Sequence, residues 1–277
     1  MLTTIGFVGG GVMAEAMIGG LLRRQLVTPE AIAVSSPRDV RRRELTDRYG
    51  VRALADNREV ARFGALTVLA VKPQMLARVL GELKGVLRPE QVVVSIAAGG
   101  AIRTLREGLS HEAVVRAMPN TPAQIGEGIT VWTATAHVGD QQRDQVRELL
   151  LALGKELYVE EEKYLDMATA VSGSGPTYTF LVLEALIDAA VHLGFPRHIA
   201  HDLTIETMRG AILYAQQTNR HPAELRNLVT SPDGTSAEAI YQMEKGTLRT
   251  VLSKAVWAAY KKSKLLGESV GKATSAH

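Results

Sequence analysis

Residues 5–22, IGFVGGGVMAEAMIGGLL, place an apolar strand, a glycine turn and the start of a helix in immediate succession. Gly9, Gly11 and Ala14 fit the pattern G-x-G-x-x-A. In that pattern the first glycine permits a tight turn, the second lets a pyrophosphate approach the backbone, and the small third residue packs helix on strand. Free N–H groups and the dipole at the helix N-terminus would stabilise the phosphate. We therefore expect a dinucleotide site here rather than a purely structural turn.

Short apolar runs alternate with helix-like segments on the C-terminal side of this turn. The expected strands are TIGFV, IAVS, LTVLAV, VVVSIA, VVRAM and ITVW. This alternation predicts a parallel sheet with helices on both faces. From Lys163 onward apolar residues recur at helical spacing, which predicts helices only. The expected fold is an α/β nucleotide-binding, Rossmann-like domain in residues 1–162 and an all-α domain in residues 163–277.

Two segments are expected to have no specific structural or functional role. The glutamate run at residues 160–162, next to the expected junction, is interpreted as a solvated surface. The tail after Gly267 is expected to be loosely ordered.

The composition excludes several classes of protein. The chain has 277 residues, a net charge of +3 and only 5% aromatic residues, and its basic and acidic residues are interspersed, so we expect no nucleic-acid partner. The absence of cysteine excludes disulfides and thiolate sites and suits the cytoplasm. No secretory signal or membrane span is expected, and His198 and His201 lack the carboxylate partner of a metal site, so we expect a cytoplasmic protein without a metal.

The segment after the second expected strand bears on the choice of cofactor. A site for NAD would place an acidic residue there to bind the ribose 2′-hydroxyl, but the sequence reads SSPRD at residues 35–39, with the carboxylate better placed to cap a helix. Two hydroxyls and Arg38 would suit a 2′-phosphate, and one charge-assisted contact contributes about 1.5–3 kcal/mol. We therefore expect NADP as cofactor, with NADPH preferred over NADH. A solvated Arg38 is the alternative, and Arg41 and Arg42 are weaker candidates.

Three more turns follow expected parallel strands, at residues 70–73, 95–99 and 118–122. The carboxyl ends of such strands open onto a ligand crevice, and the small or rigid residues there would let backbone approach a nicotinamide or a substrate. Lys72 could contact a cofactor phosphate or lie on the surface, and Asn57 near the ribose is similarly open.

Several segments together resemble pyrroline-5-carboxylate reductases. They are GFVGGGVMAEA, AVKPQ, SIAAG, MPNTPAQIGEG, SGSGPTYTFLVLEAL and SPDGTSAEAI, in this order, and the resemblance runs to about Gly267. It implies reduction of the cyclic imine acid 1-pyrroline-5-carboxylate to L-proline by NAD(P)H, the last step of proline synthesis. It also implies a helical domain that forms a homodimer, often within a ring of dimers, and an active site between a nucleotide domain and the helical domains of the dimer.

The resemblance assigns site residues one by one. The positions that match cofactor contacts are Val8, Gly9, Gly10, Gly11, Val12, Met13, Ser36, Arg38, Asn57, Ala70, Val71, Lys72, Pro73, Ile96, Ala97 and Ala98. The positions that match the substrate loop, and are the catalytic candidates, are Ser231, Thr235 and Ser236.

The chemistry expected of the loop is modest. A protonated imine is already electrophilic and needs mainly a hydride donor held close in a fixed orientation. We expect Ser236 to bind the imine nitrogen, and Thr235 with backbone N–H groups to bind the carboxylate. A plain helix N-cap is the alternative for these hydroxyls.

The loop departs from the family pattern S-P-G-G-T-T at two positions. Ser236 keeps the hydroxyl of the usual threonine but loses the methyl group that restricts its rotamer. Asp233 replaces a glycine, which a turn tolerates, and we expect its carboxylate to point away from the anionic substrate.

Two other functions are alternatives for a chain with this organisation. A carbonyl reductase similar to the β-hydroxyacid dehydrogenases would carry a catalytic lysine on the first helix after the domain junction, but no lysine occurs between Lys163 and Lys245. A non-catalytic NADP-binding regulator would not need the hydroxyl loop, which is intact.

Overall fold

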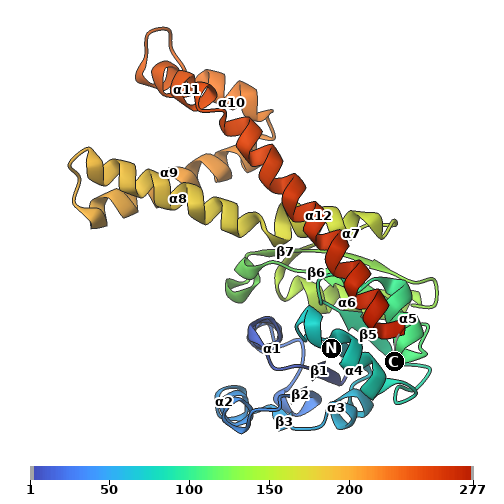
Figure 1. Cartoon of the computed structure of the whole chain (residues 1–277). Coiled ribbons are helices and arrows are strands. Elements are labelled where there is room, and N and C mark those ends of the chain that lie inside the picture. The colour runs from blue at the N-terminus through green and yellow to red at the C-terminus, as the bar shows by residue number, and fades with distance from the viewer. Residues whose placement is uncertain (1–2, 276–277) are drawn as a thin grey trace. The chain divides into compact units, whose positions relative to one another are not determined.

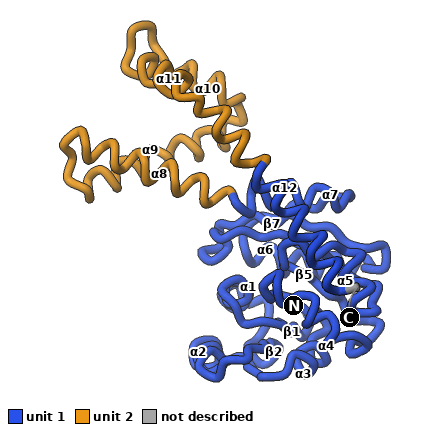
Figure 2. The backbone as a smooth tube through the Cα atoms, in the orientation of Figure 1, with its two compact units in different colours: residues 1–174, 258–277 blue, residues 175–257 orange. Residues whose placement is uncertain are grey.

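The structure is a computed structural model that describes residues 3–275. The chain divides into two compact units, one formed by Met1–Ser174 with Ala258–His277 and the other by Gly175–Trp257 (Figures 1 and 2). Helix α7 (Lys163–Ala168) belongs to the first unit because it packs against strands β6 (Val114–Met118) and β7 (Gly128–Ala134). The compact units divide after Ser174 and after Trp257, not after residue 162. The expected domain boundary after residue 162 stays a prediction.

Within residues 3–275 the strands form one eight-stranded sheet in the order β3-β2-β1-β4-β5-β6-β7-β8. The strands expected from the sequence are present as β1 (Ile5–Val8), β2 (Ile32–Ser35), β4 (Leu66–Leu69), β5 (Val92–Ser95), β6 (Val114–Met118) and β7 (Gly128–Ala134). The sequence patterns missed β3 (Arg52–Leu54) and β8 (Gly154–Tyr158), which form the two edges and contain no buried residue.

One strand pair departs from the expected parallel arrangement. Strand β7 runs antiparallel to β6, while every other pair in the described sheet is parallel. The segment between β6 and β7 contains only a short 3-10 helix, η2 (Thr121–Ile125). A parallel pair needs a crossover of a dozen or more residues, usually helical, so this short connection turns the chain back on itself.

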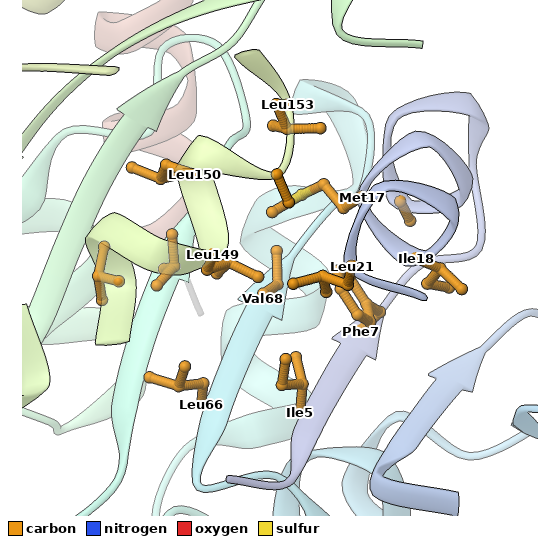
Figure 3. Packing of buried hydrophobic residues seen from close by; sticks show 14 of the residues in the cluster. Ile5, Phe7, Met17, Ile18, Leu21, Leu66, Val68, Leu149, Leu150 and Leu153 are labelled. Atoms are coloured by element: carbon orange, nitrogen blue, oxygen red, sulfur yellow. The ribbon is translucent and has the colours of Figure 1, made fainter. Parts of the chain in front are cut away.

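Helices cover both faces of the sheet, as expected. Their bounds are α1 (Val12–Arg23), α2 (Asp39–Tyr49), α3 (Asn57–Phe63), α4 (Pro73–Leu83), α5 (Ile102–Leu109) and α6 (Asp140–Leu151), with a short 3-10 helix, η1 (Pro29–Ala31). Ile5 and Phe7 point into one apolar cluster, with Met17 of α1 and Leu149 of α6 (Figure 3). The neighbouring Val8 belongs to the cluster under α3, α4 and α5. Alternate residues of one strand thus serve two cores, which is why the strands read as continuous apolar runs.

The described chain from α7 onward is helical, also as expected. After α7 comes the π-helix η3 (Thr169–Gly173), and then α8 (Gly175–His192), α9 (Arg197–Thr218), α10 (Pro222–Leu228), α11 (Thr235–Lys245) and α12 (Leu248–Ser275). Helices α8 to α11 with the start of α12 form the second unit. Helices α8 and α9 pack on each other. Large apolar side chains of α8 are nevertheless exposed, among them Phe180 at 61% and Leu181 at 66%.

The last helix leaves the helical unit and ends in the sheet unit. Its C-terminal part packs closely on the sheet unit, because a Cβ built on Gly99 would lie 2.9 Å from the backbone nitrogen of Gly267. Val270 is buried in the cluster with α3, α4 and α5. The expectation of a loosely ordered tail after Gly267 is therefore wrong as far as Ser275, and residues 276–277 lie outside the described residues.

Candidate functional site

The glycine turn has the geometry of a backbone cradle. Gly9 has a φ of 102°, which L-residues rarely adopt. A Cβ at Gly9 would lie 2.9 Å from Cγ1 of Val71 and 3.0 Å from the carbonyl oxygen of Ala70. Gly11 is the N-cap of α1, and a Cβ there would meet only the carbonyl oxygen of Ala70, at 3.9 Å. The N-terminus of α1 is therefore open in front of Gly11, as a bound pyrophosphate requires.

The first glycine is fixed from the second strand. The backbone N–H of Gly9 donates to Oγ of Ser35 at 3.0 Å, and Ser35 Oγ in turn donates to Oδ1 of Asn57 at 2.7 Å. Ser35 is 1% exposed and Asn57 is half-buried at the start of α3. Ser35 thus links Asn57 to the glycine turn, a role that the sequence pattern of the ribose segment does not predict.

Arg38 is the free arginine of the segment after β2. It is the exposed N-cap residue of α2, and its side chain has no hydrogen bond or ion pair to any residue of the described chain. Arg41 donates to the carbonyl oxygen of Gly10 at 2.8 Å and pairs with Glu15. Arg42 donates to the carbonyl oxygen of Ser36 at 2.8 Å and pairs with Asp39. The Arg38 guanidinium is therefore available to a ligand, which favours Arg38 over Arg41 and Arg42 as the candidate for a 2′-phosphate.

Arg41 was missed as a support of the glycine turn. Its partner Glu15 lies in the first turn of α1 and also accepts from Arg48 at 2.9 Å and Tyr49 at 3.1 Å. Burial raises the pKa of the Glu15 carboxyl, but the hydrogen bonds from Arg41 and Tyr49 and the charges of Arg41 and Arg48 outweigh it, so the pKa is lowered. No local pattern reveals this cluster, because Glu15 and Arg41 are 26 positions apart in the sequence.

The next two crevice turns lie at the carboxyl ends of β4 and β5. Ala70 N–H donates to the carbonyl oxygen of Val8 at 2.9 Å, and Ile96 N–H donates to that of Leu69 at 3.1 Å, so both turns continue the ladder from β1. Lys72 is exposed as the N-cap of α4, and Pro73 is the first residue of that helix. These residues, with Ala97 and Ala98, line up along the same sheet edge as the glycine turn.

The glutamate run at residues 160–162 is exposed at Glu160 and Glu161, as expected, but Glu162 has partners within the sheet unit. Glu162 accepts from the backbone N–H of Ile102 at 2.8 Å and from Arg116 at 2.9 Å. Arg116, whose side chain is 6% exposed, also pairs with Asp166 at 2.7 Å, and Asp166 accepts from Ser263 of α12 at 3.1 Å. Glu162 therefore joins α5 to β6, and Arg116 and Asp166 extend this cluster to α7 and α12, so the expectation of a solvated surface is wrong for Glu162.

The segment TSPDGTS forms a turn before α11 within the helical unit. The hydroxyl of Thr230 donates to the carbonyl oxygen of Arg226 at 2.7 Å and so belongs to the end of α10. The N–H of Gly234 donates to the carbonyl oxygen of Ser231 at 3.1 Å, which closes the turn. Asp233 is exposed and has a φ of 56°, in the region that favours glycine. A glycine adopts this φ without strain, which explains the glycine of the family pattern at this position. Aspartate is one of the few other residues that adopt it, so the turn tolerates Asp233.

Thr235 and Ser236 are the first two residues of α11, whose N-cap is Gly234. Neither hydroxyl caps that helix, because the N-cap position is occupied by Gly234 and no side chain makes a capping hydrogen bond there. The alternative interpretation, a plain serine or threonine N-cap, therefore does not describe these two residues. Their roles toward a substrate, and those of the cofactor candidates, stay predictions.

The described part of the chain contains neither a candidate metal site nor a candidate membrane-spanning helix. Among residues 3–275 no group of three histidine, cysteine, aspartate or glutamate side chains is arranged to hold a metal ion. Over the same residues no helix is both long enough and apolar enough to cross a bilayer.

Comparison with known proteins matches the two parts of the chain to two different families. Residues 162–266 match the family described as pyrroline-5-carboxylate reductase dimerisation, and residues 4–99 match the family described as NADP oxidoreductase coenzyme F420-dependent. Over 269 residues the chain is 40% identical to the pyrroline-5-carboxylate reductase of Synechocystis sp., covering 97% of this chain and 100% of the relative.

Solved structures agree with these matches. The pyrroline-5-carboxylate reductase from Coxiella burnetii aligns with a TM-score of 0.87 at 35% identity, over 96% of this chain and 99% of the other. The pyrroline carboxylate reductase of Plasmodium falciparum, solved with NADP bound, aligns with a TM-score of 0.88 at 30% identity, over 96% of this chain and 98% of the other.

Proposed function

Because the chain belongs to the pyrroline-5-carboxylate reductase family, we propose that it reduces 1-pyrroline-5-carboxylate to L-proline with a reduced nicotinamide dinucleotide. The observation that carries this proposal is the full-length match to a reductase of this name, at 40% identity. It is supported by a glycine cradle that fits a pyrophosphate and by a hydroxyl-bearing turn at a helix N-terminus.

The cofactor is assigned to the glycine turn and the neighbouring strand ends. The bound dinucleotide supplies the hydride. Gly9 to Met13 hold its pyrophosphate at the N-terminus of α1. Ala70 to Pro73 and Ile96 to Ala98 bring backbone close to its nicotinamide half, and Ser36, Arg38 and Asn57 bind its adenosine half. NADPH is preferred over NADH, because Arg38 is unpaired and the carboxylate that follows β2, that of Asp39, pairs with Arg42 and Arg43.

The substrate is assigned to the turn before α11. The first N–H groups of that helix and the hydroxyl of Thr235 bind the carboxylate. Ser236 hydrogen-bonds the imine nitrogen, and a water or one of the hydroxyls relays the proton that the amine product needs. Ser231 contributes the third hydroxyl of the turn, and Asp233 points away from the anionic substrate.

The active form is at least a homodimer. The exposed apolar side chains of α8 and α9, which include Phe180, Leu181 and Leu203, are too extensive for a helical unit that faces water on its own. A second copy of this chain would cover them, and a measurement of the mass in solution distinguishes a single dimer from a ring of dimers. The cytoplasm is the compartment that suits a cysteine-free enzyme of this kind.

The test is to add 1-pyrroline-5-carboxylate to the purified protein with NADPH and to follow the loss of reduced-nicotinamide absorbance, with proline identified as product. Turnover with a 3-hydroxy acid instead would favour a carbonyl reductase of the β-hydroxyacid dehydrogenase type. Binding of NADPH without any turnover would favour a non-catalytic regulator. Repeating the assay with NADH and with related cyclic imine acids measures the two preferences.

A further inference from the structure

Glu82, on the last turn of α4, ends a line of hydrogen bonds that starts in the glycine turn. Gly9 N–H donates to Ser35, Ser35 donates to Asn57 Oδ1, and Asn57 Nδ2 donates to Oε2 of Glu82 at 2.7 Å. Glu82 was not a candidate from the sequence, since it lies 25 positions from Asn57 in a helix of ordinary composition.

The direction of every bond in this line is fixed by chemistry. A backbone N–H can only donate, so Ser35 accepts from Gly9 and has its own hydrogen left for Asn57. A carboxylate can only accept, so Asn57 must turn its NH₂ group toward Glu82. The reverse orientation of the Asn57 amide would place its carbonyl oxygen against the carboxylate and leave the hydroxyl hydrogen of Ser35 without its acceptor.

The Asn57 amide has one hydrogen to spare in this orientation. Its NH₂ group has two hydrogens, Glu82 takes one, and no residue of the described chain accepts the other. Asn57 is only half-buried, so part of the residue remains open to a ligand. A phosphate can only accept hydrogen bonds, whereas a ribose hydroxyl can accept or donate. Both groups can accept from the spare N–H, but a hydrogen bond to the charged phosphate is stronger than one to a neutral hydroxyl, so this amide favours a phosphate.

We propose that Glu82 is a positioning residue for cofactor choice: it holds the Asn57 amide so that its spare N–H binds the 2′-phosphate of NADPH. The proposal rests on the proposed function in one respect, the assignment of Asn57 to the adenosine half of the cofactor. Glu82 itself touches Asn57 and not the cofactor.

The negative charge of Glu82 is compensated on the other side. Its Oε1 accepts from Nε of Arg78 at 2.8 Å, and the Arg78 side chain is 72% exposed. This pairing matters because a bare carboxylate close to a phosphate would oppose binding. Charge and orientation therefore make opposite predictions: removal of Glu82 should strengthen NADPH binding if its charge dominates and weaken it if its hold on Asn57 dominates.

The experiment measures the Kd of NADPH and of NADH by fluorescence for the full chain, without substrate. For Glu82→Met, which keeps length and loses the acceptor, we expect the Kd of NADPH to rise about tenfold, the factor that one hydrogen bond to a charged group is worth, and that of NADH less than about twofold. Glu82→Gln retains an acceptor for Asn57 and should stay within about threefold of the wild type. Arg78→Gln is the matched control, since it removes the partner of Glu82 that is not Asn57, and it should leave both Kd values within about twofold. Glu82→Ala serves the same comparison if the methionine variant does not fold.

A double-mutant cycle separates positioning from a role of Glu82 alone. In an Asn57→Ala background the Glu82→Met change should have no further effect on the Kd of NADPH. Tighter NADPH binding by Glu82→Met, equal losses for the two cofactors, or a further loss in the Asn57→Ala background would each overturn the proposal. In turnover assays the KM for NADPH should rise with kcat unchanged. If the wild type shows no turnover, the proposed function fails while the binding measurements still decide the role of Glu82.

Discussion

The two units of this chain bury their apolar residues to very different degrees. In the sheet unit every residue of β1, β2, β4 and β5 is buried, and helices cover both faces. In the helical unit Ile187 is the buried residue of α8, Ala200 that of α9, and the described residues of α10 and α11 include none. The hydrophobic effect is thus satisfied by one chain in the first unit and left unsatisfied in the second. The helical unit is therefore the one with an apolar surface left to cover, and it lies within the residues that match the dimerisation family.

The largest effect is expected in the helical unit, where a charge on the exposed apolar face of α8 tests whether this face forms the dimer interface. Leu181 is 66% exposed on α8, and replacing it with aspartate would place a charge within the proposed dimer interface. We expect Leu181→Asp to raise the dissociation constant of the dimer by at least about a hundredfold, as measured by analytical ultracentrifugation. Val40 on α2 is as exposed, at 70%, so Val40→Asp should leave the dimer intact. A dimeric Leu181→Asp protein would argue against this face as the interface.

The second effect should be confined to the sheet unit. Gly9→Ala puts a Cβ at a φ of 102° and within 2.9 Å of Val71. We expect on the order of 1–3 kcal/mol of strain and at least tenfold weaker NADPH binding, with the dimer unaffected. Gly81 in α4 has no atom within 4 Å of its would-be Cβ, so Gly81→Ala should bind NADPH normally and be slightly more stable. Normal NADPH affinity in Gly9→Ala would remove the pyrophosphate from this turn.

A third substitution sharpens the description of the cofactor site. Arg38→Asp replaces an unpaired cation with an anion where a 2′-phosphate is assigned, and should raise the KM for NADPH about tenfold or more and that for NADH much less. Arg43→Asp makes the same charge change five residues on, at an arginine that is 77% exposed and paired with Asp39, and should change both values little. Equal losses for NADPH and NADH in Arg38→Asp would contradict the preference.

The smallest effect concerns pH and again should be limited to the sheet unit. The lowered pKa of Glu15 means that the unfolded chain binds more protons in acid than the folded chain does. This contribution to stability is complete above the usual glutamate pKa and is lost as the pH falls through the lowered value. Glu15→Gln should therefore flatten the acid side of a plot of unfolding free energy against pH, while Glu59→Gln, at an exposed site without an ion pair to described residues, should not. Parallel curves for wild type and Glu15→Gln would show that the cluster has no such role.

The sequence predicted those parts of the molecule whose pattern is local. The glycine turn, the buried strands and the helical second half all follow from residues that are neighbours in the chain. The edge strands β3 and β8 escaped because short, half-exposed strands carry few apolar residues. Glu162 was misread because its role depends on Arg116, 46 positions away. Glu82 was missed for the same reason, and no spacing rule links it to Gly9.

The C-terminal stretch of α12 has a consequence for how the protein is made. Val270 completes the apolar cluster under α3, α4 and α5, and Gly267 lies against the Gly99 turn. Ribosomes deliver the chain from its N-terminus at roughly 5–20 residues per second, so the first unit to be synthesised is the last to be completed. Until residue 270 emerges, part of that cluster faces water. A stop codon shortly after the helical unit would therefore damage the nucleotide-binding half, which was translated long before it.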